Sequence, residues 1–259
     1  MNIRQPAVSG AFYPDQQELL QTVVTNLMSE ATERELSPKV LIVPHAGYIY
    51  SGAIAASGYK QLEPFRRQIR RVVLLGPSHQ LAFEGIALPD CEAYSTPIGD
   101  IPLDIDAIKS LERFSQIQTL DAAHAREHSL EVQCPFLQNA LDNFKLIPLV
   151  VGDASPYSVA EIIDFLWGGE ETLIVISSDL SHYLTYEEAK HRDSQTTKAI
   201  EQMSCALTGG QACGCYPLNG MLKVAQRRGM EVVTLDVRNS GDTAGDKTRV
   251  VGYGAYVIQ

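Results

Sequence analysis

The chain alternates short apolar runs with amphipathic segments of about a dozen residues. Apolar runs rich in β-branched residues predict buried strands at 40–43, 71–75, 144–151, 173–176, 231–237 and 249–258. Helical periodicity or an alanine-rich composition predicts helices at 15–30, 51–62, 103–114, 157–166, 186–203 and 217–228. The segment 124–141 is expected to be mostly helical, with Pro135 near a helix start or a kink. This order is typical of the α/β class. We therefore expect one domain, residues 1–259, with a mostly parallel central sheet and helices on both faces.

Glycine, proline and small polar residues mark the boundaries of these elements. Asp15 is placed to cap the first helix, and Gly229 is placed to end the helix that begins near Pro217. Residues 84–103 contain several glycines and prolines, which favour short strands and turns. The glycine-rich stretch 239–246 is either a lid over a site or a plain surface loop.

Three predicted strands are each followed by a histidine. Pro44-His45 follows the strand at 40–43, and Gly76-Pro77-Ser78-His79 follows the next strand. The strand at 173–176 leads into Ser177-Ser178-Asp179-Leu180-Ser181-His182. Because ligands bind outside the carboxyl ends of the strands in open α/β sheets, we expect these histidines to form one composite site.

The residue types at this site indicate a metal and proton transfer. Neutral imidazole is the commonest metal ligand, and His45 and His79 occupy matching positions. Asp179 lies three residues before His182. It either caps a helix or orients His182 as a general acid or base.

The segment His124-Ala125-Arg126-Glu127-His128 permits three interpretations. It matches the His-x-x-Glu-His pattern of inverted zinc peptidases, in which both histidines bind zinc and the glutamate is the base. It also suits a helix start, where acidic residues favour the positive end of the dipole. In the third interpretation, His128 and Glu131 face the same pocket as His45 and His79.

Other catalytic patterns are weaker. The serines near His182 are not part of a Gly-x-Ser-x-Gly motif, and no nucleotide-binding glycine pattern occurs, so no nucleotide cofactor is expected. Cys213-Gly214-Cys215 precedes a predicted helix. A thiolate there would suit a soft metal, although a structural role fits both cysteines equally well.

Composition narrows the function classes. A formal net charge of −10 argues against nucleic-acid binding. No apolar run is long enough for a membrane span, and the first residues lack a signal-peptide core. Five cysteines without a Cys-x-x-Cys pair predict reduced thiols and a cytoplasmic location.

Read together, the motifs resemble the Memo family, which includes AmmeMemoRadiSam system protein B. The matching segments run in order along the chain from residue 7 to beyond residue 214. They are Ala7-Val8-Ser9-Gly10-Ala11-Phe12-Tyr13-Pro14, Pro44-His45-Ala46-Gly47-Tyr48, Leu75-Gly76-Pro77-Ser78-His79, Glu127-His128-Ser129-Leu130-Glu131, Ser177-Ser178-Asp179-Leu180-Ser181-His182 and Cys213-Gly214.

The resemblance implies a fold similar to the class III extradiol ring-cleavage dioxygenases and a non-haem metal site. It makes His45 and His79 metal ligands and Cys213 the third ligand, where the dioxygenases have a glutamate. It makes His182 the acid/base residue. Tyr48 and Ser78, from the same motifs, are expected to line the pocket with His128 and Glu131.

A ligand set of two histidines and a thiolate accepts Fe(II), copper or zinc. The resemblance also implies radical-SAM and AMMECR-type proteins as partners. Two functions follow as hypotheses. The first is a metal-dependent oxidoreductase acting on a small molecule. The second is a binding module that kept the cleft without catalysis and uses it to bind a peptide or a partner protein.

Overall fold

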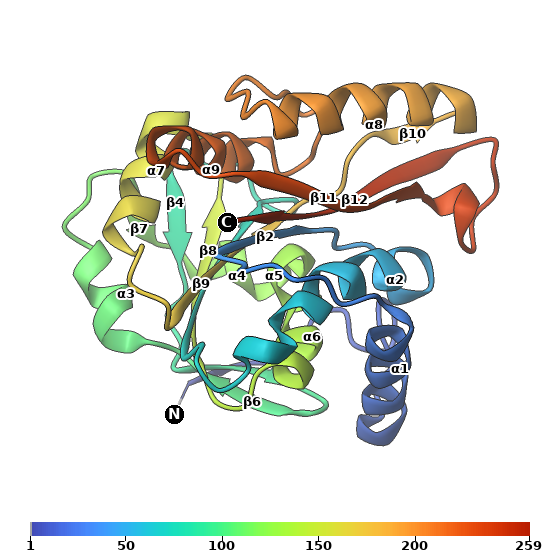
Figure 1. Cartoon of the computed structure of the whole chain (residues 1–259). Coiled ribbons are helices and arrows are strands. Elements are labelled where there is room, and N and C mark those ends of the chain that lie inside the picture. Colours follow the sequence, from blue (N-terminus) through green and yellow to red (C-terminus); the bar gives the residue numbers. More distant parts are fainter. Residues whose placement is uncertain (1) are drawn as a thin grey trace.

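The computed structural model describes residues 2–259, which form a large sheet between two layers of helices (Figure 1). The strands in chain order are β1 (Ile3–Arg4), β2 (Val40–Val43), β3 (Arg71–Pro77), β4 (Ile86–Leu88), β5 (Ala93–Thr96), β6 (Gly99–Pro102), β7 (Ile117–Thr119), β8 (Lys145–Val151), β9 (Thr172–Ser177), β10 (His182–Leu184), β11 (Val232–Asn239) and β12 (Val250–Ile258). The α-helices are α1 (Gln17–Glu30), α2 (Tyr48–Tyr59), α3 (Ile105–Leu111), α4 (Asp121–Ala125), α5 (His128–Glu131), α6 (Cys134–Ala140), α7 (Pro156–Phe165), α8 (Tyr186–Glu201) and α9 (Cys215–Arg228). Two 3-10 helices are η1 (Lys60–Phe65) and η2 (Ser240–Asp242).

The main sheet has the order β10-β12-β2-β9-β3-β8-β4-β7, and β11 pairs with β12. Its four central strands, β2, β9, β3 and β8, are parallel to one another. The antiparallel pairs β12–β2 and β8–β4 flank this centre, so the sheet is mixed. A smaller sheet has the order β1-β5-β6. The predicted α/β class, with a parallel centre covered on both faces, is confirmed.

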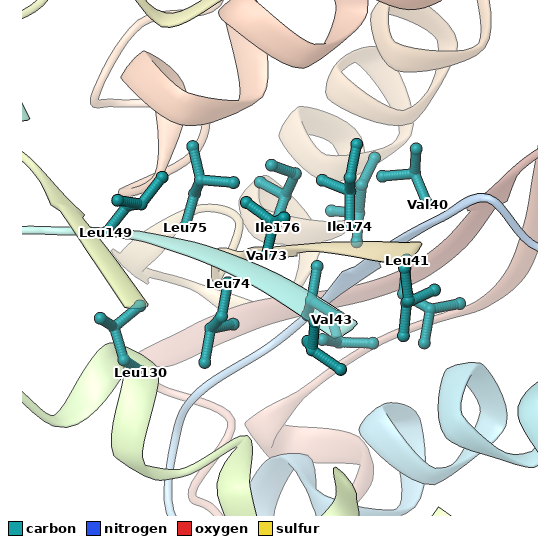
Figure 2. Close-up of a cluster of buried hydrophobic side chains, with 14 of the residues drawn as sticks. Val40, Leu41, Val43, Val73, Leu74, Leu75, Leu130, Leu149, Ile174 and Ile176 are labelled. Carbon is teal, nitrogen blue, oxygen red and sulfur yellow. The ribbon is translucent and has the colours of Figure 1, made fainter. Parts of the chain in front are cut away.

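The core lies on both faces of the central strands because parallel strands are buried on both sides. In Figure 2, Val73 and Leu75 point to one face of the sheet and Leu74 to the other. Helices α7 and α9 pack together on one face, and α1, α2 and α6 pack on the other. Each fully buried aliphatic side chain contributes about 1.5–3 kcal/mol to the free energy of folding. This core fixes the positions of the strand ends.

The segment 124–141 is the main departure from the predicted helices. It forms the three short helices α4, α5 and α6, with a break between α4 and α5 in addition to the helix start expected near Pro135. Pro135 lies at the start of α6, where its missing N–H costs nothing. At the first predicted boundary, Gln16 rather than Asp15 precedes α1, with no side-chain cap. Gly229 ends α9 in the left-handed conformation, as predicted (φ +64°).

A close approach at Gly76 brings α5 against the end of β3. A Cβ atom at this position would lie 2.7 Å from Ser129 Oγ, so only glycine permits the contact. The chain after α4 can then turn so that His128 faces the ends of the central strands. Over residues 2–259, no helix has the length and apolar character needed to span a membrane.

Candidate metal centre

The carboxyl ends of three neighbouring parallel strands meet at one edge of the sheet. The order β2-β9-β3 places the loop with His45, the end of β9 at Ser177 and the loop with His79 side by side. Each strand is a buried apolar run that ends where polar residues begin. The local sequence therefore sets which side chains emerge at this edge.

Three histidines converge here, and we call His45, His79 and His128 the three-histidine cluster. One ring nitrogen of each lies within 4.8 Å of the corresponding atoms of the other two. The ring centroids are 5.1 Å apart for His45 and His79, and 4.5 Å apart for His79 and His128. His45 is buried, His128 is half-buried and His79 is exposed, so the cluster reaches from the interior to solvent.

Ser177 determines which nitrogen of His45 is free. The Ser177 hydroxyl donates to the Ser129 carbonyl oxygen at 2.6 Å, so its single hydrogen is used there. His45 Nδ1, 2.9 Å from Ser177 Oγ, must then donate, which leaves Nε2 with its lone pair. Burial, together with the neighbouring histidines, lowers the pKa of His45 well below its usual value, so this imidazole is neutral.

Glu127 holds His79 by two hydrogen bonds. The His79 N–H donates to Oε2 at 2.6 Å, and Nδ1 lies 2.8 Å from Oε1. Burial alone would raise the pKa of Glu127, but the bonds from His79 and from the Ser129 N–H outweigh it and lower that pKa to about 2. The ionised carboxylate only accepts, so His79 Nδ1 donates and Nε2 is free. Such carboxylate–histidine pairs are typical of metal sites.

His128 begins α5 beside the same carboxylate. Its Nδ1 lies 3.4 Å from Glu127 Oε1, and its ring contacts Phe12 at 4.8 Å between centroids. Burial lowers the pKa of His128 below its usual value, despite the nearby carboxylate. The uncharged state of His45 and His128 suits metal binding, which requires neutral imidazole.

Cys213 lies next to the cluster, in the loop before α9. Its Sγ is 3.3 Å from His45 Nε2 and receives the Asp179 N–H at 3.3 Å. Burial and the Asp179 carboxylate raise the pKa of the thiol, so it carries a proton without a metal. The Cys213 thiol and the free nitrogen of His45 are close enough to reach one ion.

His182 also belongs to this edge, but Asp179 does not orient it as expected. His182 Nδ1 donates to the Leu180 carbonyl oxygen at 2.9 Å, which leaves Nε2 free. The Asp179 carboxylate instead accepts the His45 N–H at 2.8 Å. Burial raises the pKa of Asp179 to about 7, although the backbone N–H of His45 opposes the shift. Asp179 therefore fixes the His45 loop.

The remaining expected pocket residues use their polar atoms within the protein. The Tyr48 hydroxyl donates to the Val132 carbonyl oxygen, and the Ser78 hydroxyl donates to that of Leu81. The carboxylate of Glu131 is buried and held by other groups. It accepts hydrogen bonds from Arg4 Nη1, the Tyr13 hydroxyl and the backbone N–H groups of residues 7 and 8.

The zinc-peptidase hypothesis is wrong, because His124 and His128 do not share a helix. Helix α4 ends at Ala125 and α5 begins at His128. His124 is buried and uses both nitrogens: Nε2 donates to the Ala87 carbonyl oxygen at 2.9 Å, and Nδ1 accepts from the Tyr94 hydroxyl at 2.6 Å.

Sequence reasoning missed the two residues that orient the cluster. Ser177 appeared only as part of a serine-rich strand end, and Glu127 only as a catalytic base or a helix-start residue. A signal for Glu127 was present, because it directly precedes His128 in the Memo-like segment. Its contact with His79, 48 residues away, depends on the tertiary fold.

The fold and the cluster define an α/β protein with a candidate metal centre at the carboxyl edge of its parallel strands. A family model described as "Memo-like protein" matches residues 4–257, which is nearly the whole chain. The chain belongs to the Memo family.

Relatives agree with this assignment, and a solved structure shares the fold. A "MEMO1 family protein" of Aquifex aeolicus is 37% identical over 98% of each chain. One from Methanosarcina acetivorans is 34% identical over the full length of both. The crystal structure of uncharacterized protein JW3007 from Escherichia coli K12 has a TM-score of 0.52 and 11% identity, and the match covers 84% of this chain and 98% of that one. That structure supports the fold alone.

Proposed function

We propose that the chain binds a metal ion through His45, His79 and His128 and acts as an oxidoreductase on a small molecule. The observation that carries the proposal is the approach of three imidazole nitrogens to within 4.8 Å of one another. The surrounding hydrogen bonds support it, because Ser177 and Glu127 leave Nε2 of His45 and of His79 free to bind an ion.

The donor set fits a transition metal better than magnesium or calcium. Imidazole nitrogens suit iron, copper and zinc, and a nearby thiol adds a soft ligand. We propose Fe(II) or copper as the native ion, with zinc as an alternative, and Cys213 as a further ligand. A bound ion would polarise a substrate oxygen, and iron or copper would also supply redox chemistry.

The chain's own residues provide proton transfer and positioning. The free Nε2 of His182 is available to accept or donate a proton, because Nδ1 is held by the Leu180 carbonyl oxygen. Burial lowers the pKa of His182 and the nearby His79 lowers it further, which supports a role for this imidazole next to the cluster. Asp179 fixes the backbone of His45, so its contribution is positional.

Metal analysis of anaerobically purified protein tests the proposal. We expect near-stoichiometric metal in the wild type and loss of metal in the His45→Ala, His79→Ala and His128→Ala variants. His191→Ala is the matched control, because His191 is exposed on α8. Absence of metal from the wild type, even after reconstitution with Fe(II), Cu(I) or Zn(II), would refute the metal-binding proposal.

The role of Cys213 needs its own comparison. If the thiol is a ligand, Cys213→Ser should lower metal content or affinity, whereas Cys205→Ser, a half-buried cysteine away from the cluster, should not. Equal metal binding in both variants would limit the ligand set to the histidines.

A binding module without catalysis is the second candidate. Exposed apolar residues follow the site residues at three places. Ile49, near the start of α2, is 71% exposed, and Leu81, in the loop after β3, and Tyr216, near the start of α9, are each 38% exposed. Such side chains suit contact with a peptide or partner protein. Co-purification with radical-SAM or AMMECR-type proteins, together with absence of turnover by metal-loaded protein, would favour this function.

A further inference from the structure

Tyr183, directly after His182, has an unusual backbone conformation. Its φ is +62°, in the left-handed region that bulky residues rarely adopt, and its side chain is 62% exposed. It lies in β10, whose pairing with β12 is irregular between His182 and Leu184. Such a conformation costs on the order of 1–3 kcal/mol, and burial of this side chain does not offset that cost.

The Tyr183 ring contacts both His182 and Arg249. The ring centroids of Tyr183 and His182 are 5.7 Å apart. The guanidinium carbon of Arg249 lies 4.4 Å from the Tyr183 ring centroid. A chain of contacts therefore runs from the histidine edge of the sheet to an exposed arginine.

Arg249 lacks the acidic partner that most arginines of this acidic chain have. Ion pairs hold Arg4, Arg66, Arg71, Arg227 and Arg238, among others. Within residues 2–259, no carboxylate forms an ion pair with Arg249. The Tyr183 hydroxyl likewise has no hydrogen-bond partner in this range. Both groups therefore keep their hydrogen-bonding capacity for a ligand.

We propose that Arg249 and Tyr183 form an anion subsite at the mouth of the metal centre, which binds an oxyanion group, a carboxylate or a phosphate, of the substrate. The placement beside the reacting groups rests on the proposed function. A guanidinium presents paired donors that match the oxygens of either group, and the aromatic ring holds its plane in place. The site would thereby select anionic small molecules over neutral ones of the same shape.

Binding of three probes tests the subsite: benzoate, phenyl phosphate and uncharged benzyl alcohol. We expect calorimetry on the wild type to show the anionic probes binding at least about tenfold more tightly than benzyl alcohol, with an affinity that falls as salt rises. Arg249→Met should remove this preference, and Tyr183→Leu should weaken it. A larger effect on benzoate than on phenyl phosphate would identify a carboxylate as the natural group, and the reverse would identify a phosphate.

Arg113→Met is the matched control. Arg113 is exposed and stacks on Phe165 at 4.3 Å, so this variant removes the same charge from a similar pair elsewhere. Each measurement is made on chelator-treated and on metal-loaded protein. The loss of anion binding in Arg249→Met should be seen in the chelator-treated and in the metal-loaded protein. This separates failure of the subsite from failure of the metal proposal. An equal loss of affinity for the anionic probes in Arg113→Met and Arg249→Met would overturn the inference. So would the absence of a preference for anionic probes in the wild type.

Discussion

Replacing Glu127 by glutamine tests whether this carboxylate sets the metal centre. Glu127 is buried and accepts from the His79 backbone N–H, from His79 Nδ1 and from the Ser129 N–H. Glutamine has nearly the same shape but only one acceptor oxygen. If that oxygen takes the place of Oε1, the new NH₂ group faces the His79 N–H, and two donors oppose each other.

The expected magnitude follows from these contacts. One buried donor left without a partner costs about 1–3 kcal/mol of folding free energy. His79 also loses the negatively charged Glu127 carboxylate that orients its ring. Loss of such a partner typically lowers metal affinity about 10–100-fold. Both effects come from one carboxylate, so stability and metal affinity should fall together.

Competition with a chelator of known affinity measures metal binding, and urea unfolding of the metal-free protein measures stability. Glu63→Gln is the control, because Glu63 forms a partly exposed ion pair with Lys60, and such pairs contribute little. The control should keep wild-type metal affinity. Wild-type affinity and stability in Glu127→Gln would show that the carboxylate does not organise the cluster.

Three further outcomes are expected. Arg4→Met should destabilise the fold by about 3–5 kcal/mol in urea unfolding, because it leaves a buried carboxylate unpaired. Burial lowers the pKa of His124 from 6.5 to about 4, so the unfolded state binds more protons between these values. Stability should therefore fall by about 3 kcal/mol as the pH drops from about 6.5 to about 4, and by less in a His124→Gln variant followed by denaturant titration. Gly252→Ala would place a Cβ atom against the anchored Asp193 carboxylate and should lower the free energy of unfolding by about 1–3 kcal/mol. Gly209→Ala, with open space around the new Cβ atom, should leave the thermal midpoint unchanged.

The strand-end residues could be predicted because their positions depend on local pattern. The runs before His45 and His79 are apolar and end at a proline or a Gly-Pro pair, so the sequence itself marks where each strand stops. The parallel order β2-β9-β3 then brings these ends together. The break between α4 and α5, within the mostly helical segment 124–141, was not predicted because helical periodicity does not report breaks that tertiary contacts impose.

Those breaks are what give the metal centre its third histidine. Arg4 donates to the carbonyl oxygens of His124 and Glu127, at 2.8 and 2.7 Å, on either side of the gap between α4 and α5. A continuous helix would use those carbonyls in its own hydrogen bonds. By binding them, the amino-terminal segment stabilises the interruption that turns Glu127 toward His79 and His128 toward the cluster. Contacts between residues 120 and 123 apart in sequence therefore stabilise a local helix boundary, which is why no window around residue 128 could have predicted it.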